Sequence, residues 1–306
     1  MKKGKVSVIG LVGQSAFMGA ATFPQLGETI SCNSLFFEIG GKGCNQALAC
    51  AQMGAEAVFI GAIGKDDNGQ LTKKMFHEAD MEYIFFEKNI PTAFATITTD
   101  RTGENTVAVY PGAAKELSAQ DLRREDFLQT LESSDYLLLQ NELSHECLFA
   151  AIDLAGEEGI PVIFNPAPAG PGLEACLPKC SLITPNFAEA KALLGLTGDV
   201  SDEMIVGGFR RMGVEQGIVT DGGRGILVFD SKDSYRLSAY RAGEVVDTTG
   251  AGDVFNGTLA AFLAQGVTLR EAAQRAVVAA GISVTRKGAA ISVPSLREVE
   301  CCLSDL

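Results

Sequence analysis

The segment Asp247–Asp253 (DTTGAGD) places two glycines and two carboxylates at the start of a helix-like run. Gly250 and Gly252, with Ala251 between them, allow a tight backbone that leaves amide N–H groups free at a helix N-terminus, where the macrodipole also favours anions. Such amides can stabilise the charge on a transferring phosphoryl group. Asp253 could take a proton from an attacking hydroxyl, or it could simply cap the helix.

A second glycine-rich segment, Gly40–Ala47 (GGKGCNQA), also opens a helical pattern. Gly41 and Gly43 permit close approach of a ligand, while Lys42 and Asn45 offer hydrogen-bond donors for hydroxyl groups. A plain turn with an exposed lysine accounts for the same residues. No GxxxxGK[ST] occurs anywhere, and no GxGxxG follows the first apolar run. These absences disfavour a P-loop and a dinucleotide-binding site, and with them an NAD-dependent oxidoreductase.

Two further turns follow apolar, strand-like runs. In Thr184–Glu189 (TPNFAE), Asn186 would cap a helix, and Glu189 three residues later completes a capping box. The functional alternative is that Glu189 holds Mg²⁺ through water. Thr220–Gly225 (TDGGRG) fits either a hairpin turn or a loop that contacts a nucleotide. Neither segment decides between its alternatives alone.

The elements that must position these residues alternate between strand-like and helical patterns, which predicts an α/β fold with a mostly parallel sheet covered on both faces. The predicted strands are Val6–Gly10, Val58–Ile63, Tyr136–Leu139, Val162–Phe164, Leu182–Thr184, Gly217–Thr220 and Ile226–Phe229. The predicted helices are Asn45–Met53, Gly69–Ala79, Ser144–Glu158, a helix from Phe187, Asp253–Gln265 and Leu269–Thr285.

Two segments, 14–37 and 92–110, break this alternation because they are rich in Thr, Val and Phe. The second is typical of a β-hairpin that turns at Arg101–Asn105. Together they predict a small separate sheet inserted in the α/β core, placed as a lid over the site. No repeats or linker-like tracts occur, so we expect one domain over residues 1–306.

Composition excludes several classes of function. The chain has 306 residues, 46% of them hydrophobic, and a net charge of −13. An acidic chain repels nucleic acid and anionic membrane, and no apolar stretch is long enough to cross a bilayer. Eight cysteines without a CxxC pair and only two histidines give no zinc-ligand set. With no signal-peptide core at the N-terminus, free thiols favour the cytoplasm.

Taken together and in order, these segments resemble the ribokinase family of carbohydrate kinases, also called PfkB. The resemblance runs from Val8 to Pro294 and is strongest, on the ribokinase branch, at GGKGCNQA, NPAPA (Asn165–Ala169), ITPN (Ile183–Asn186), VVDTTGAGDVFNG and TRKGA (Thr285–Ala289). It implies a doubly wound α/β core with a small β-sheet lid that commonly forms a dimer contact. The implied activity is transfer of the γ-phosphoryl group of Mg·ATP to a sugar hydroxyl.

The resemblance also implies a role for each matching residue. Asp253 would be the catalytic base, and the Gly250–Gly252 amides would form the anion hole. Sugar hydroxyls would contact Gly41, Lys42, Gly43, Asn45, Glu142, Asp253 and Ser15. ATP would contact Asn186, Thr220, Gly222, Gly223, Gly225 and Gly252, with Glu189 organising Mg²⁺. A monovalent cation, K⁺, would lie by Asp247, Thr249, Ser283, Arg286, Gly288 and Ser292, partly on backbone carbonyls.

One departure concerns the sugar. Where the family has an Asn-x-Asp that binds ribose hydroxyls, this chain has Gly13 and Ser15. Losing a charge-assisted hydrogen bond costs about 1.5–3 kcal/mol, which weakens binding by roughly one to two orders of magnitude. Gln14 or Gln25 could compensate. Ribose is the first expectation, and deoxyribose, a hexose, a nucleoside or a non-catalytic binding role are the alternatives.

Overall fold

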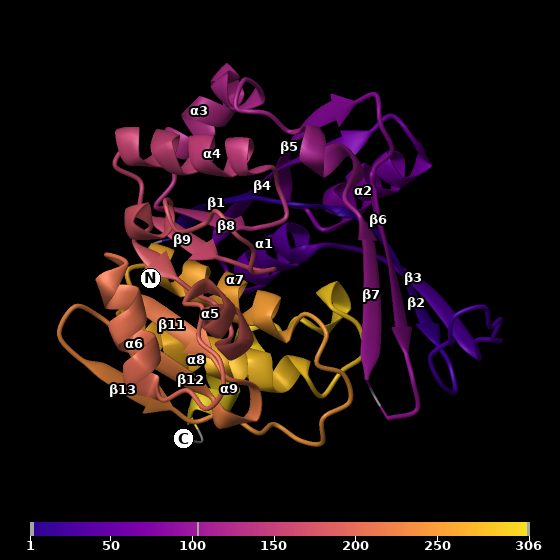
Figure 1. Ribbon diagram of the computed structural model, residues 1–306. Helices are drawn as coiled ribbons and strands as arrows, with labels where there is room; N and C mark the ends of the chain where they lie inside the picture. Colours follow the sequence, from indigo (N-terminus) through magenta and orange to yellow (C-terminus); the bar gives the residue numbers. More distant parts are fainter. Residues whose placement is uncertain (1–2, 103, 305–306) are drawn as a thin grey trace.

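A nine-stranded sheet runs through the centre of the molecule in the computed structural model, which describes residues 3–102 and 104–304 (Figure 1). Its spatial order is β13-β12-β11-β10-β9-β8-β1-β4-β5. Strand β12 is antiparallel to both of its neighbours, β11 and β13, and the remaining pairs from β11 to β5 are parallel. The strands are β1 (Lys5–Ile9), β4 (Glu56–Gly64), β5 (Glu82–Lys88), β8 (Tyr136–Gln140), β9 (Val162–Asn165), β10 (Leu182–Ile183), β11 (Gly217–Thr220), β12 (Ile226–Phe229) and β13 (Ser234–Leu237).

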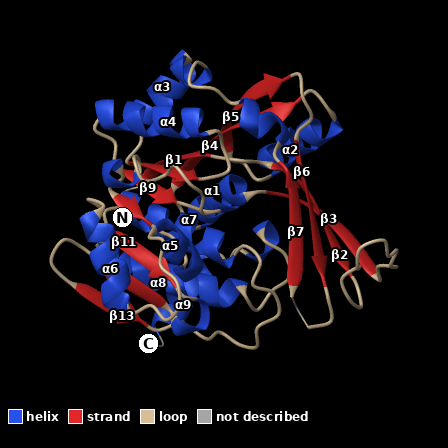
Figure 2. Ribbon diagram, viewed as in Figure 1, coloured by secondary structure: helices blue, strands red, loops and turns tan. Residues whose placement is uncertain are grey.

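Both faces of this sheet are covered by helices (Figure 2). Successive residues of a strand point to opposite faces, so Leu137 and Leu139 join one core cluster and Leu138 the other. The first cluster includes side chains of α3 (Glu125–Glu132), α4 (His145–Glu157), α5 (Phe187–Leu193) and α6 (Asp202–Arg211). The second includes side chains of α1 (Lys42–Gln52), α2 (Asp67–Glu78), α7 (Ala251–Ala264), α8 (Leu269–Ser283) and α9 (Leu296–Ser304).

A second sheet of four strands extends along one side of the main body (Figure 1). Its order is β3-β2-β6-β7, with bounds β2 (Gly13–Gly19), β3 (Ser34–Gly40), β6 (Ala93–Thr99) and β7 (Asn105–Tyr110). These strands come from the two segments that the sequence marks as β-rich. β3 runs beyond the predicted limit at residue 37 to Gly40, and the hairpin turn includes residue 103, which lies outside the described residues.

The predicted α/β class and every predicted strand and helix are confirmed, with ends that shift by a few residues. The helix predicted to end at Thr285 ends at Ser283, because the Thr285 and Arg286 N–H groups donate to carbonyls three residues back, at Ile282 and Ser283, in place of the four-residue spacing of an α-helix. Sequence patterns missed β5, β13, α3, α6 and α9, which lie at sheet edges or on the outer layer. Among the described helices, none combines the length and apolarity that crossing a bilayer requires.

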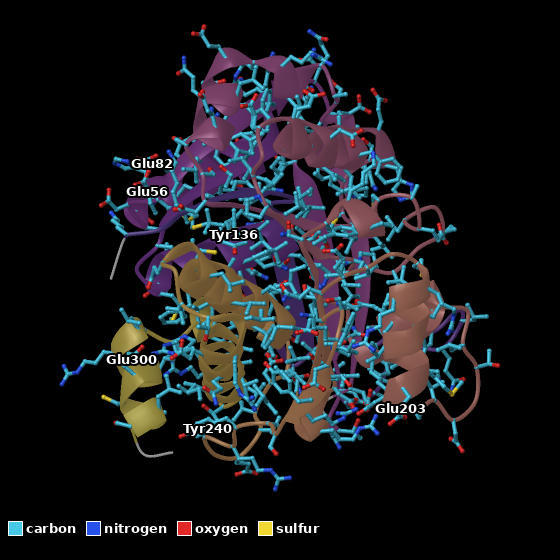
Figure 3. The ribbon with its side chains drawn as sticks, turned by 90° about the vertical axis from the view of Figure 1, so that its left-hand side faces the viewer. Glu56, Glu82, Tyr136, Glu203, Tyr240 and Glu300 are labelled. Carbon is cyan, nitrogen blue, oxygen red and sulfur yellow. The ribbon has the colours of Figure 1, made fainter. Side chains whose placement is uncertain are left out.

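The parallel strands fix which edge of the sheet can hold a site. Glu56, Glu82 and Tyr136 are the first residues of β4, β5 and β8, and Figure 3 shows all three in one region of the molecule. The carboxyl ends of these strands therefore lie at the opposite edge, where ligands bind in open α/β sheets.

Helices α1 and α7 cross in close contact near this edge, and Gly257 makes the crossing possible. A methyl group at Gly257 would lie 2.3 Å from the Gln46 carbonyl oxygen and 2.5 Å from the Ala49 Cβ. The Cys50 thiol donates to the Gly257 carbonyl at 3.1 Å across the same contact. The backbones of two helices that carry site residues are thus held together at a position that only glycine fits.

Overpacking of the helix crossing by the added methyl costs about 1–3 kcal/mol, while alanine gains about 1 kcal/mol over glycine in a helix interior. We therefore expect Gly257→Ala to lower the free energy of unfolding by up to about 2 kcal/mol. Denaturant unfolding measures the effect. Gly156→Ala in α4 is the matched control, since no neighbouring atom lies within 4 Å of its added methyl. Equal stability changes in the two variants would contradict this account of the crossing.

Candidate functional site

The first turn of α7 forms the centre of the candidate site. Gly250 is its N-cap, with φ of 76°, and a methyl group there would lie 2.8 Å from the Ala289 Cβ. Glycine is therefore required both by the left-handed backbone and by the close approach of residues 284–295, which join α8 to α9 and contain Ala289 (the 289 loop). The Ala251 N–H donates to the Thr248 carbonyl at 3.3 Å. Gly252, in the same predicted anion hole, has open space beside its Cα, with no neighbouring atom within 4 Å of an added methyl.

Asp253, in the same turn, is buried and held at both carboxylate oxygens. The Asn45 Nδ2 donates to its Oδ2 and the Gln46 Nε2 donates to its Oδ1, each at 3.0 Å. Both donors come from α1, across the close crossing with α7. A carboxylate that accepts hydrogen bonds from two N–H groups and faces a cavity is oriented to take a proton from a ligand hydroxyl.

Behind Asp253 lies a buried chain of amide side chains that sequence analysis did not single out. The Gln140 Nε2 donates to the Gln46 Oε1 at 2.7 Å, which fixes the Gln46 amide so that its Nε2 faces Asp253 and the Asn165 Oδ1. The Asn165 Nδ2 in turn donates to the Thr184 carbonyl at 2.8 Å. Gln140 and Asn165 end β8 and β9, so polar residues closing apolar strands were the signal available in the sequence.

A cavity of about 180 Å³ opens in front of Asp253. The predicted site residues that line it are Ser15, Gly41, Lys42, Asn45, Glu142, Thr249, Gly250 and Asp253. Gly43 does not line it, because Gly43 lies in the first turn of α1 on the side that packs against the backbone of Gly10. The wall opposite Asp253 comes from the four-stranded sheet and carries Phe17, Ile97 and Val107.

The charges in this cavity are strongly coupled. The nearby carboxylates, Asp253 foremost, raise the pKa of Lys42 against the opposing effect of its burial. Burial raises the pKa of Glu142 to about 7, while Lys42 opposes that shift and Asp253 adds to it. The Lys42 backbone N–H also donates to the Glu142 Oε2 at 3.1 Å. The cavity thus holds one ammonium among several carboxyl groups.

A larger cavity of about 570 Å³ lies on the other side of the α7 N-terminus. Thr220, Gly222, Gly223 and Gly225 line it, as the nucleotide-loop interpretation of that turn requires. The pair Ala251 and Gly252 forms part of its wall. Residues 250–253 therefore separate the two cavities, with Gly250 and Asp253 facing the smaller one and Ala251 and Gly252 the larger.

Asn186 and Glu189 stand beside the larger cavity, since Asn186 forms an isolated parallel bridge with Thr220. The capping box predicted for them is confirmed: the Asn186 N–H donates to the Glu189 Oε2, and the Glu189 N–H donates to the Asn186 Oδ1. Burial raises the pKa of Glu189, and Lys42 and Asp253 act on the same carboxyl group. Glu189 therefore caps its helix, and its carboxyl group also interacts electrostatically with Lys42 and Asp253.

The residues predicted around a monovalent cation gather where α8 ends. Asp247 accepts the Thr249 N–H at 2.9 Å and the Gly288 N–H at 3.0 Å, which ties two loops together. The Ser283 and Ser292 hydroxyls donate to the Ala280 and Ala289 carbonyls. The Arg286 guanidinium pairs with Glu298 instead. In the described residues no cluster of three or more His, Cys, Asp or Glu could hold a metal ion.

Comparison with known proteins places this geometry in a family. The family model described as pfkB family carbohydrate kinase matches residues 4–296. A ribokinase of Lactococcus lactis is 34% identical over 99% of this chain and 98% of its own length. A deoxyribokinase of Salmonella typhi is 32% identical over 92% of each chain.

Among solved structures, the ribokinase of Arabidopsis thaliana complexed with ribose and ATP superimposes with a TM-score of 0.89, at 27% identity over 99% of each chain. The match to the family model covers nearly the whole chain, including the α7 turn and the residues that hold Asp253. The chain belongs to the pfkB family of carbohydrate kinases.

Proposed function

We propose that this protein transfers the γ-phosphoryl group of ATP to a hydroxyl of a pentose, with ribose as the first candidate. The observation that carries the proposal is the position of residues 250–253 as the shared wall between two cavities. A nucleotide in the larger cavity and a sugar in the smaller one would meet at the α7 N-terminus, where the dipole and the Gly252 amide favour negative charge.

The smaller cavity suits a small polyol. Its polar side chains are mostly acceptors: Glu142, Asp253, Glu38 and the Asn45 Oδ1, which is buried and lacks a hydrogen-bond partner. Lys42 supplies the cationic donor. A ligand that satisfies this set must bring several O–H donors, as a monosaccharide does.

Asp253 would carry the proton transfer. Its carboxylate takes the proton of the sugar hydroxyl while that oxygen forms a bond to the γ-phosphorus and the bond from the γ-phosphorus to the β–γ bridging oxygen breaks, so ADP leaves. Asn45 and Gln46 keep the carboxylate oriented toward the hydroxyl. The first-turn amides of α7 stabilise the charge on the transferring group.

Two cations fit around this site. Glu189 keeps one carboxylate oxygen outside its capping box, which suits a water that coordinates Mg²⁺. Magnesium, when bound, would neutralise charge on the phosphates. For K⁺, the two loops that Asp247 ties together, at Thr249 and at Gly288, would offer backbone carbonyls beside the anion hole.

The four-stranded sheet would serve as a lid over the smaller cavity. The chain as a whole would form one α/β domain. It also exposes apolar side chains, with Leu35 58% and Phe37 56% accessible. Covering such a patch favours a homodimer through this sheet. All eight cysteines are free, which is in keeping with a cytoplasmic location.

The substrate is tested by ADP release with Mg·ATP and K⁺ across pentoses, deoxysugars, hexoses and nucleosides. The ribokinase and deoxyribokinase relatives make ribose and 2-deoxyribose the two leading candidates. Turnover of either one supports the proposal. Turnover of a hexose or a nucleoside alone would change the substrate, and ATP binding without turnover of any compound would indicate a non-catalytic binding protein.

Asp253→Asn should lower kcat by about 10²–10⁴-fold, because the hydroxyl loses its general base. Binding of ATP, measured by calorimetry, should stay close to that of the native protein. Asp153→Asn, at an exposed position on α4, is the control and should leave turnover unchanged. Near-normal turnover of the Asp253 variant would remove Asp253 from this role.

Sugar binding should depend on the ionisation of Glu142, whose pKa burial raises to about 7. The ionised carboxyl is the better acceptor, so we expect KM for the sugar to fall by about tenfold from one pH unit below to one above this pKa. Glu142→Gln should flatten that profile, and a pH dependence that survives the substitution would assign it to another group. Because the raised pKa means that folding favours the protonated form, the group's contribution to stability is complete below about pH 4.5 and is lost as pH rises through about 7.

A further inference from the structure

Glu38 is a buried carboxylate in the sugar cavity that takes no part in the proposed proton transfer, and its share in sugar recognition is a separate question. It lies on β3 and pairs in register with Ser15 of β2. Directly paired residues of neighbouring strands point to the same face of the sheet, and both side chains line the smaller cavity. Glu38 is only 8% exposed.

The contacts of Glu38 hold its carboxylate in place without using all of its acceptor capacity. The Ile291 N–H donates to Oε1 at 2.9 Å, and the Ala289 N–H donates to Oε2 at 3.2 Å. An ionised carboxylate has about four acceptor sites. Two acceptor positions of the Glu38 carboxylate thus remain for a ligand. The carboxylate is fixed at the cavity wall, and within the described residues its hydrogen-bond partners are backbone N–H groups.

The neighbouring strand cannot supply such a charge. At Gly13, any side chain would start 2.1 Å from the Ala93 carbonyl oxygen, because β2 and β6 approach closely there. Ser15 offers a single short hydroxyl, and Gln14, which also lines the cavity, offers a neutral amide, whereas Gln25 does not line it. The rest of this wall is largely apolar, with Phe17 and Ile97 prominent. On the lid side of the cavity, Glu38 is therefore the acceptor with negative charge.

We infer that Glu38 determines which sugar this protein accepts, by taking hydrogen bonds from one or two hydroxyls on the side of the sugar that faces the four-stranded sheet. This inference rests on the proposed function, since it assumes a sugar in the smaller cavity. It assigns to β3 the charged acceptor for sugar hydroxyls that Gly13 and Ser15 of β2 do not provide. It also predicts that the sugar carries a hydroxyl on the side that faces the four-stranded sheet.

The test compares Glu38→Gln with the native protein on D-ribose, 2-deoxy-D-ribose and 3-deoxy-D-ribose. For ribose, we expect kcat/KM to fall by about 10- to 100-fold, the value of a hydrogen bond to a charged group. For the analogue that lacks the contacted hydroxyl, the same substitution should cost about threefold or less. A loss of the same size for all three sugars would overturn the inference and reduce Glu38 to a tie between the lid and the 289 loop.

Asp247→Asn is the matched control, because Asp247 also accepts a backbone N–H of this loop, from Gly288, but does not line the smaller cavity. Its effect should be uniform across the sugars. Melting temperature and ATP binding establish that each variant is folded. Should the glutamine variant unfold, Glu38→Asp retains the charge on a shorter side chain, and it should show the same selective loss on ribose.

Calorimetric titration of the three sugars without ATP separates the two hypotheses. A protein that binds ribose but transfers no phosphate would contradict the proposed function, while the selective weakening by Glu38→Gln would still support the role of Glu38. If the native protein phosphorylates ribose but Glu38→Gln weakens all three sugars equally, the proposed function is supported and the role of Glu38 is overturned. A native protein that binds none of these sugars overturns the inference.

Discussion

The crossing of α1 and α7 is the contact on which the rest of the site depends. Because Gly257 carries no side chain, the two helices approach closely enough for Asn45 and Gln46 to reach both oxygens of Asp253. Both oxygens of the proposed base are thereby fixed by donors on α1, about two hundred positions before Asp253 in the sequence. If the helices were separated by a further methyl group, these hydrogen bonds would lengthen, and the carboxylate would lose its orientation.

The buried amides behind Asp253 extend this constraint into the sheet. Gln46 can face Asp253 with only one of its two amide atoms, because Gln140 donates to the other. Burying such a chain is favourable only when its members are paired, so the network specifies one arrangement of β8, β9 and α1. The polar ends of apolar strands therefore serve both the packing of the core and the geometry of the proposed base.

The sequence predicted the fold class and the order of the central elements, because their apolar periodicity and their glycines are local signals. It placed Asp253, Lys42, Asn45 and Glu142 in one site through the resemblance to a family. It did not single out Gln46, Gln140 or Asn165, since an amide that closes a strand or follows a glycine turn looks the same whether it faces solvent or a carboxylate. Glu38 was missed for a related reason: its importance comes from a cross-strand partner more than twenty positions away, which no local pattern records.

The residues proposed for phosphoryl transfer and those proposed for sugar recognition lie on different parts of the fold. Asp253 and its partners lie on helices and strands of the main body, where a change in one residue disturbs several others. Ser15 and Glu38 lie on the second sheet, whose wall of the cavity is otherwise largely apolar, so hydroxyl recognition there rests on very few groups. Substrate preference can therefore change through one or two lid positions while the phosphoryl-transfer geometry stays as it is. This separation explains why the motifs of the main body indicate the reaction more firmly than they indicate the sugar.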